Sequence, residues 1–158
     1  MTKEELIDYV YFDIAGEYLN QRMEDWSQTQ KWYNTVFELS VPVRYTYCIG
    51  ILNTQVMNGG FEQYYDNYYG IFAEETLKGL KEIGASLTHQ LVLTSTEILK
   101  KHMSPGVDLF TFITSNEHWD NKEIVDAFNR LSNEYFDLED KEDLTELLGT
   151  YLQNCEIS

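Results

Sequence analysis

The fold is decided by the stretch Asn58-Gly59-Gly60-Phe61-Glu62-Gln63-Tyr64-Tyr65-Asp66-Asn67-Tyr68-Tyr69-Gly70. Two adjacent glycines take positive φ at little steric cost, so Asn58-Gly59 predicts the end of one helix. A new segment then begins after Gly60. The stretch therefore predicts a sharp corner between two helices.

Aromatic residues follow this corner at spacings of three and four, which places Phe61, Tyr64, Tyr65 and Tyr68 on one side of a short helix. Each ring can bury a large area, and the phenol oxygens need hydrogen-bond partners, for which Gln63 and Asn67 are the expected donors and acceptors. We interpret the rings as core residues. A protein interface is the alternative, because tyrosines are enriched at interfaces.

Helical periodicity extends over most of the remaining sequence. Leu6, Ile7 and Val10 belong to an amphipathic helix over residues 3–24, with Thr2 and Glu5 as a capping box. Further helices are expected in a piece that contains Trp26 and Trp32, over 41–57, from Ala73 to Gly84, from Ser86 to the residue before Ser104, after Asp120 or Asn121, and over 140–155.

Residues 109–114, Leu-Phe-Thr-Phe-Ile-Thr, have the propensity of a strand but no partner strand in the sequence. We expect a loop or a short helix there, and an α+β fold with a small hairpin is the competing idea. The prediction is an all-α protein, a single compact multi-helix domain of about seven or eight helices over residues 1–158.

The composition is that of a folded protein: 158 residues, 43% hydrophobic and 15% aromatic. Cys48 and Cys155 both lie in apolar patterns, so we expect small core residues in a reducing compartment and no disulfide. The start of the chain is acidic, and no apolar run approaches the roughly 18 residues of a membrane span. We expect a soluble, cytoplasmic protein.

Charge is the strongest compositional signal. Twenty-seven acidic and 11 basic side chains give a formal net charge of −16. Such a surface repels nucleic acid and anionic lipid headgroups and attracts basic partners. Direct binding to nucleic acid or to a membrane surface is therefore not expected.

No motif in the sequence predicts catalysis. His89, His102 and His118 lack the spacing of a helical metal site, and no Cys-x-x-Cys occurs. Gly59-Gly60 has neither the P-loop lysine nor the Gly-x-Gly-x-x-Gly spacing. We expect no metal, no cofactor and no enzymatic activity.

The last third of the chain carries most of the excess charge, because residues 107–158 hold 13 acidic and three basic side chains. On two helices this spacing would place a carboxylate about every 5 Å, against about 3.4 Å per phosphate along one DNA strand. A solvated face is the simpler interpretation; a partner-binding face is the other. The candidate partner-binding residues are Glu134, Asp137, Glu139, Asp140, Glu142, Asp143 and Glu146.

The string Asn-Gly-Gly-Phe-x-Gln-Tyr-Tyr-x-Asn at residues 58–67 resembles the signature of a bacterial family of small, acidic, all-helical proteins whose namesake is a DNA-mimic protein. The likeness extends to Trp32 with residues 43–45, to residues 80–85 and to residues 147–152. The motif residues that carry it are Asn58, Gly59, Gly60, Phe61, Gln63, Tyr64, Tyr65 and Asn67. The resemblance implies an all-helical domain over the whole chain.

Two functions follow as expectations. The resemblance implies an inhibitor that mimics DNA and occupies the nucleic-acid-binding surface of a basic protein, such as a transcriptional regulator. The acidity also suits an immunity- or antitoxin-like protein that neutralises a basic toxin. The expected partner is a basic DNA- or RNA-binding protein, and the sequence leaves a homodimer open.

Overall fold

The chain begins with one continuous helical rod from Lys3 to Arg22, close to the expected range 3–24. The rod consists of α1 (Lys3–Asp8), a π-helical stretch η1 (Tyr9–Gly16) and α2 (Glu17–Arg22). The Thr2 hydroxyl accepts a hydrogen bond from Glu5 N (3.1 Å), and the Glu5 carboxylate accepts one from Thr2 N (2.7 Å). The predicted capping box is confirmed.

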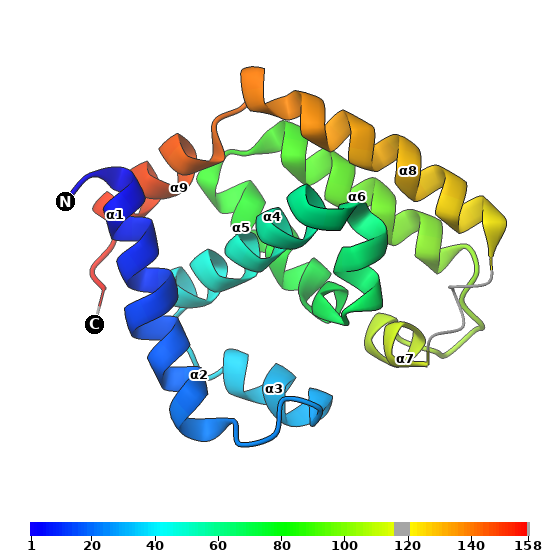
Figure 1. The fold of residues 1–158 in the computed structure, drawn as a ribbon, viewed down its shortest axis with the longest axis horizontal. Coiled ribbons are helices and arrows are strands. Elements are labelled where there is room, and N and C mark those ends of the chain that lie inside the picture. Colours follow the sequence, from blue (N-terminus) through cyan, green and yellow to red (C-terminus); the bar gives the residue numbers. More distant parts are fainter. Residues whose placement is uncertain (116–120, 158) are drawn as a thin grey trace.

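The computed structural model describes residues 1–115 and 121–157, and 78% of it is helical, in one compact domain (Figure 1). No strand occurs in these two ranges, so the all-α prediction is confirmed and residues 109–114 form a helix. After the rod, the elements are α3 (Thr29–Val36), α4 (Val41–Asp66), η2 (Tyr69–Phe72), α5 (Ala73–Ile83), α6 (Ser86–Lys100), α7 (Leu109–Thr114), α8 (Lys122–Phe136), η3 (Asp137–Asp140) and α9 (Leu144–Gln153).

Helix α4 runs through the middle of the domain and contacts η1, η2, α5 and α8 (Figure 1). The rod approaches it closely at Gly50, where an added β-carbon would lie 2.5 Å from the Tyr11 ring. The missing side chain at Gly50 therefore makes room for the Tyr11 ring. At the other end of the rod, α1 packs against α9, which brings the two ends of the chain together.

The predicted corner lies inside α4, at Gly59 and Gly60. Only Gly60 has a positive φ (+76°), and its added β-carbon would lie 2.7 Å from Ser132 Oγ of α8. The φ of Gly59 is −153°, which does not require glycine, so the expectation that the first glycine takes positive φ is wrong. The next helical segment can start at Phe61 because Gly60 reverses the local backbone.

The aromatic rings after the corner lie in the core. Phe61, Tyr64 and Tyr65 are fully buried, and Tyr65 stacks on Phe128 of α8 with ring centroids 5.1 Å apart. Tyr68 is not part of this helix, because the helix ends at Asp66 and Tyr68 adopts the left-handed conformation (φ +67°). The corner thus attaches α4 to α8.

The last helix is shorter than the expected range 140–155. Asp143 caps α9 by accepting a hydrogen bond from Glu146 N (3.0 Å), and residues 137–140 form the separate 3-10 turn η3. The sequence pattern did not reveal this turn, because the carboxylates and apolar residues keep their helical spacing through it. This break changes the geometry of the acidic residues described next.

Candidate functional site

The seven carboxylates predicted to bind a partner do not form one regular row. Only Glu134 lies within α8 and only Glu146 within α9. Asp137, Glu139 and Asp140 lie in η3, and Glu142 and Asp143 in the connection to α9. The rise of about 5 Å per carboxylate expected for continuous helices therefore does not extend over the set.

Three of the seven have structural roles. Glu142 is only partly exposed, and its carboxylate accepts hydrogen bonds from Leu87 N (3.0 Å), Thr88 N (2.7 Å) and Thr88 Oγ1 (2.6 Å) at the start of α6. Asp143 caps α9, and Glu146 forms an ion pair with Lys3. Glu142 is thus not a free surface carboxylate, because the N–H groups at the start of α6 need an acceptor.

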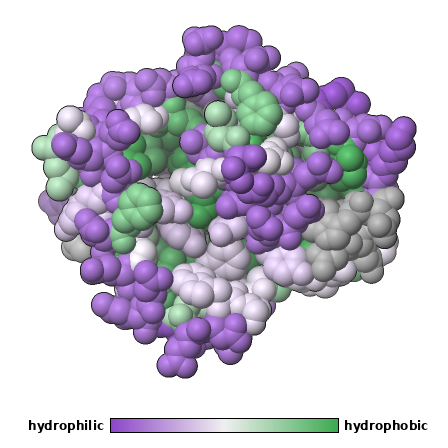
Figure 2. Space-filling view, viewed as in Figure 1, coloured by the Kyte–Doolittle hydropathy of each residue, from purple (hydrophilic) through white to green (hydrophobic). Residues whose placement is uncertain are grey.

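The other four carboxylates, Glu134, Asp137, Glu139 and Asp140, are exposed. None of the four makes a hydrogen bond or an ion pair with another residue in the described ranges 1–115 and 121–157. We call these four residues the acidic turn. It lies at the upper edge of the molecule in Figure 1, where α8 ends, and hydrophilic residues cover that edge in Figure 2.

The polar side chains of the corner bond to one another. Gln55 Oε1 accepts hydrogen bonds from Gln63 Nε2 (3.0 Å) and Asn67 Nδ2 (3.1 Å), and Asn58 Nδ2 donates to Gln63 Oε1 (3.2 Å). The phenol of Tyr65 is instead hydrogen-bonded to Ser95 Oγ (2.6 Å). These amides tie together the two halves of α4 on either side of the kink, which is a structural role.

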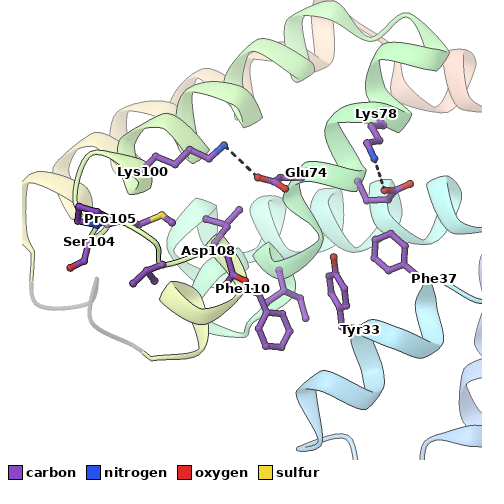
Figure 3. Close-up of a pocket in the computed structure, with 14 residues that line it drawn as sticks. Tyr33, Phe37, Glu74, Lys78, Lys100, Ser104, Pro105, Asp108 and Phe110 are labelled. Carbon is purple, nitrogen blue, oxygen red and sulfur yellow. Dashed lines mark ion pairs between the residues drawn. The ribbon is translucent and has the colours of Figure 1, made fainter.

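A cleft of about 590 Å³ lies between α3, α5 and the connection from α6 to α7 (Figure 3). Three partly exposed rings, those of Tyr33, Phe37 and Phe110, contribute to its wall, and Glu74, Lys78 and Lys100 are among the charged residues that line it. The sequence analysis missed this site. The only local signal is the spacing of Tyr33 and Phe37, because the other residues come from separate helices.

The four glutamate and lysine side chains of this cleft form two ion pairs, whereas Asp108, which also lines it, caps α7 by accepting a hydrogen bond from Thr111 N. Lys100 Nζ lies 3.4 Å from Glu74 Oε1, and Lys78 Nζ lies 3.5 Å from Glu75 Oε2 (Figure 3). Glu75 is buried and also accepts a hydrogen bond from Arg44 Nε (3.1 Å), so its position is fixed. Partial burial, and then the carboxylates of Glu74 and Glu75, raise the pKa of the Tyr33 phenol, which keeps it protonated at neutral pH.

Metal-ligating side chains do not gather anywhere in the described ranges: no group of three or more histidine, cysteine, aspartate or glutamate residues has the geometry for a metal ion. Asn121 Nδ2 lies 3.2 Å from His102 Nδ1, and His118 falls outside the described residues. No described helix combines the length and the apolar character needed to cross a membrane. Cys48 is buried and Cys155 partly buried, and both are free thiols.

A model of the DMP19-like protein family matches residues 37–155, about three quarters of the chain. This match overturns the assignment to a DNA-mimic family that the corner motif suggested. In this chain the motif forms the kink of α4. No curated protein and no solved structure matches the chain.

Proposed function

The chain belongs to the DMP19-like protein family, and for this member we propose that the acidic turn binds a basic nucleic-acid-binding protein and competes with its nucleic acid. This proposal rests on charge and geometry. It does not depend on the family resemblance drawn from the corner motif.

The observation that carries the proposal is the exposure of four carboxylates within seven residues of sequence, Glu134 to Asp140, none of which has a side-chain partner among residues 1–115 and 121–157. Like charges placed this close repel one another. The other three candidates, Glu142, Asp143 and Glu146, have structural contacts, so we assign the binding role to the acidic turn alone. A cationic surface would relieve the repulsion and gain favourable electrostatic energy.

The net charge of −16 extends the attraction beyond the turn itself. A field of one sign steers a basic partner toward the surface and repels free nucleic acid. Exposed charges are screened over about 8 Å at physiological ionic strength, so association should weaken steeply with salt. An apolar docking surface would show little dependence on salt.

The test starts with the recovery of partners from the native cell on the immobilised protein, with elution by raised salt and identification by mass spectrometry. A gel-shift competition then uses the recovered partner and its own nucleic acid. We expect displacement of the nucleic acid. A helix-turn-helix regulator would identify a regulatory role, and a basic toxin would favour the immunity-like alternative. Formation of a ternary complex would contradict competition.

A matched pair of variants tests the acidic turn. The first converts Glu134, Asp137, Glu139 and Asp140 to their amides. The control does the same to four exposed acids of the rod, namely Glu4, Asp8, Asp13 and Glu17. Each variant removes four charges. At about 0.2–1 kcal/mol for each exposed pair, the first should weaken binding by about 1–4 kcal/mol, and the control should weaken it much less. Equal losses would show that net charge alone drives binding.

A further inference from the structure

The cleft of Figure 3 combines an aromatic wall with charges of both signs at its mouth. Lys100 comes from the last turn of α6 and Glu74 from the first turn of α5, and their ion pair connects these two helices. The side chains of Lys100 and Glu74 are 50% and 63% exposed. An ion pair this exposed contributes little to stability, so a ligand can separate its two charges at low cost.

The aromatic wall lies beside these charges. The Tyr33 ring is 4.7 Å from the ring of Phe37 and 5.4 Å from that of Phe110, measured between centroids. Phe72, which is fully buried, stacks against Tyr33 with an interplanar angle of 7° and fixes the ring from the core side. In Figure 3 the Tyr33 ring lies between the rings of Phe110 and Phe37. A flat apolar group in the cleft would therefore meet a rigid aromatic surface.

We propose that this cleft binds a small zwitterion with an aromatic side chain, of the class of the aromatic α-amino acids. Its carboxylate pairs with Lys100, its ammonium group pairs with Glu74, and its ring packs against the wall of Tyr33, Phe37 and Phe110. The ligand thus replaces the ion pair of Lys100 and Glu74 with two new pairs. The volume of about 590 Å³ is in the range of small-molecule sites.

The charge pattern selects a zwitterion over other ligands. A simple anion would have to approach a protein of net charge −16 and would leave Glu74 unpaired. A simple cation would leave Lys100 unpaired and would meet Lys78 on the same cleft. A zwitterion pairs with both Lys100 and Glu74 and adds no net charge to the protein. The protonated Tyr33 hydroxyl provides a further donor beside them.

The first test compares three probes by NMR titration of the full-length protein: L-phenylalanine, phenylacetate and phenethylamine. The last two each lack one of the two charged groups. We expect L-phenylalanine to bind about two- to fivefold more tightly than either, since each lost pair of exposed charges weakens binding by roughly that factor. Shift changes should appear in residues 33–37, 71–78 and 100–110. Equal affinity for all three probes would overturn the proposal, as would shift changes elsewhere or no saturation by about 10 mM.

The second test uses paired variants on the same helices. Lys100→Met and Glu74→Gln should each weaken L-phenylalanine binding about two- to fivefold. Lys100→Met should reduce its preference over phenethylamine, which lacks the carboxylate, and Glu74→Gln should reduce its preference over phenylacetate, which lacks the ammonium group. The controls Lys101→Met and Glu82→Gln change exposed residues that do not line the cleft, and they should bind as the unmodified chain does. If Lys100→Met binds as Lys101→Met does, the proposed carboxylate contact is wrong. The acidic turn is not part of this cleft, so neither result bears on the proposed protein partner.

Discussion

Glu142 provides the sharpest test of how the acidic residues divide between folding and binding. Its carboxylate accepts three hydrogen bonds at the start of α6, although 54 residues of sequence separate it from Thr88. The residue before α6, Ala85, has no side chain that could cap the helix. Glu142 therefore acts as the cap of α6 from a distant part of the chain, and Glu142→Ala should destabilise the protein.

The size of the effect follows from the three donors. Leu87 is exposed, so water can replace the lost bond to its N–H, whereas Thr88 is only 1% exposed and its two donors stay buried. Loss of a helix cap costs about 1–2 kcal/mol, and a buried donor without a partner costs about 1–3 kcal/mol. Allowing for rotation of the Thr88 hydroxyl, we expect the free energy of unfolding to fall by about 2–3 kcal/mol. For a chain of this length the Tm should fall by roughly 5–10 °C.

The assay is urea unfolding followed by far-UV circular dichroism, with Glu139→Ala as the control. Glu139 lies three residues earlier, is exposed and makes no hydrogen bond or ion pair in the described part of the chain. Its removal should change the free energy of unfolding by less than about 0.5 kcal/mol. The midpoint should shift for Glu142→Ala while the m-value stays constant. Equal stability of the two variants would refute the capping role and return Glu142 to the set of free surface carboxylates.

Three further predictions concern the core. Gly60→Ala should lower the free energy of unfolding by more than about 1 kcal/mol, because φ is +76°. Gly59→Ala has a φ of −153°, which any residue adopts, although its added β-carbon would lie 2.0 Å from Gln63 Oε1 and would displace that side chain. It should lower the free energy of unfolding less, because the Gln63 side chain can move, and chemical denaturation of the two variants checks the order. Tyr65→Phe should cost about 1 kcal/mol because it loses the bond to Ser95. Tyr64→Phe should cost nothing or stabilise, because that buried hydroxyl makes no hydrogen bond in the described ranges. Equal denaturation midpoints for the Tyr65→Phe and Tyr64→Phe variants would contradict this difference. Burial raises the pKa of Tyr11 to about 12, and other buried tyrosines shift in the same direction. Their neutral forms stabilise the fold below the unfolded-state pKa of about 10, and this contribution is lost as the pH rises from about 10 through the folded pKa. Circular dichroism should show unfolding in that interval, and a native spectrum well above pH 12 would contradict it.

Local sequence patterns were sufficient for most of the helices, although not for α7 or for the start of α9. The rod, α5 and α6 follow from apolar spacing together with Thr2, Gly84 and Ser86 at their ends, because these signals act within one or two turns of the chain. The corner was predictable as well, since Gly59-Gly60 before a cluster of rings has few other interpretations. Which glycine needs a positive φ was not predictable, because that depends on the approach of Ser132 from α8.

The candidate sites depended on contacts that the sequence does not encode locally. By itself the sequence determined the helical fold and an acidic C-terminal third, because periodicity and net charge are properties of short segments and of composition. Only the tertiary structure divided the seven carboxylates into structural and unpaired groups, because Glu142 finds its partners in α6 and Glu146 finds Lys3. The tertiary structure also brought Glu74 to Lys100 beside Tyr33. A cleft forms where separate helices meet, and the sequence of one helix does not specify which helices will pack against it.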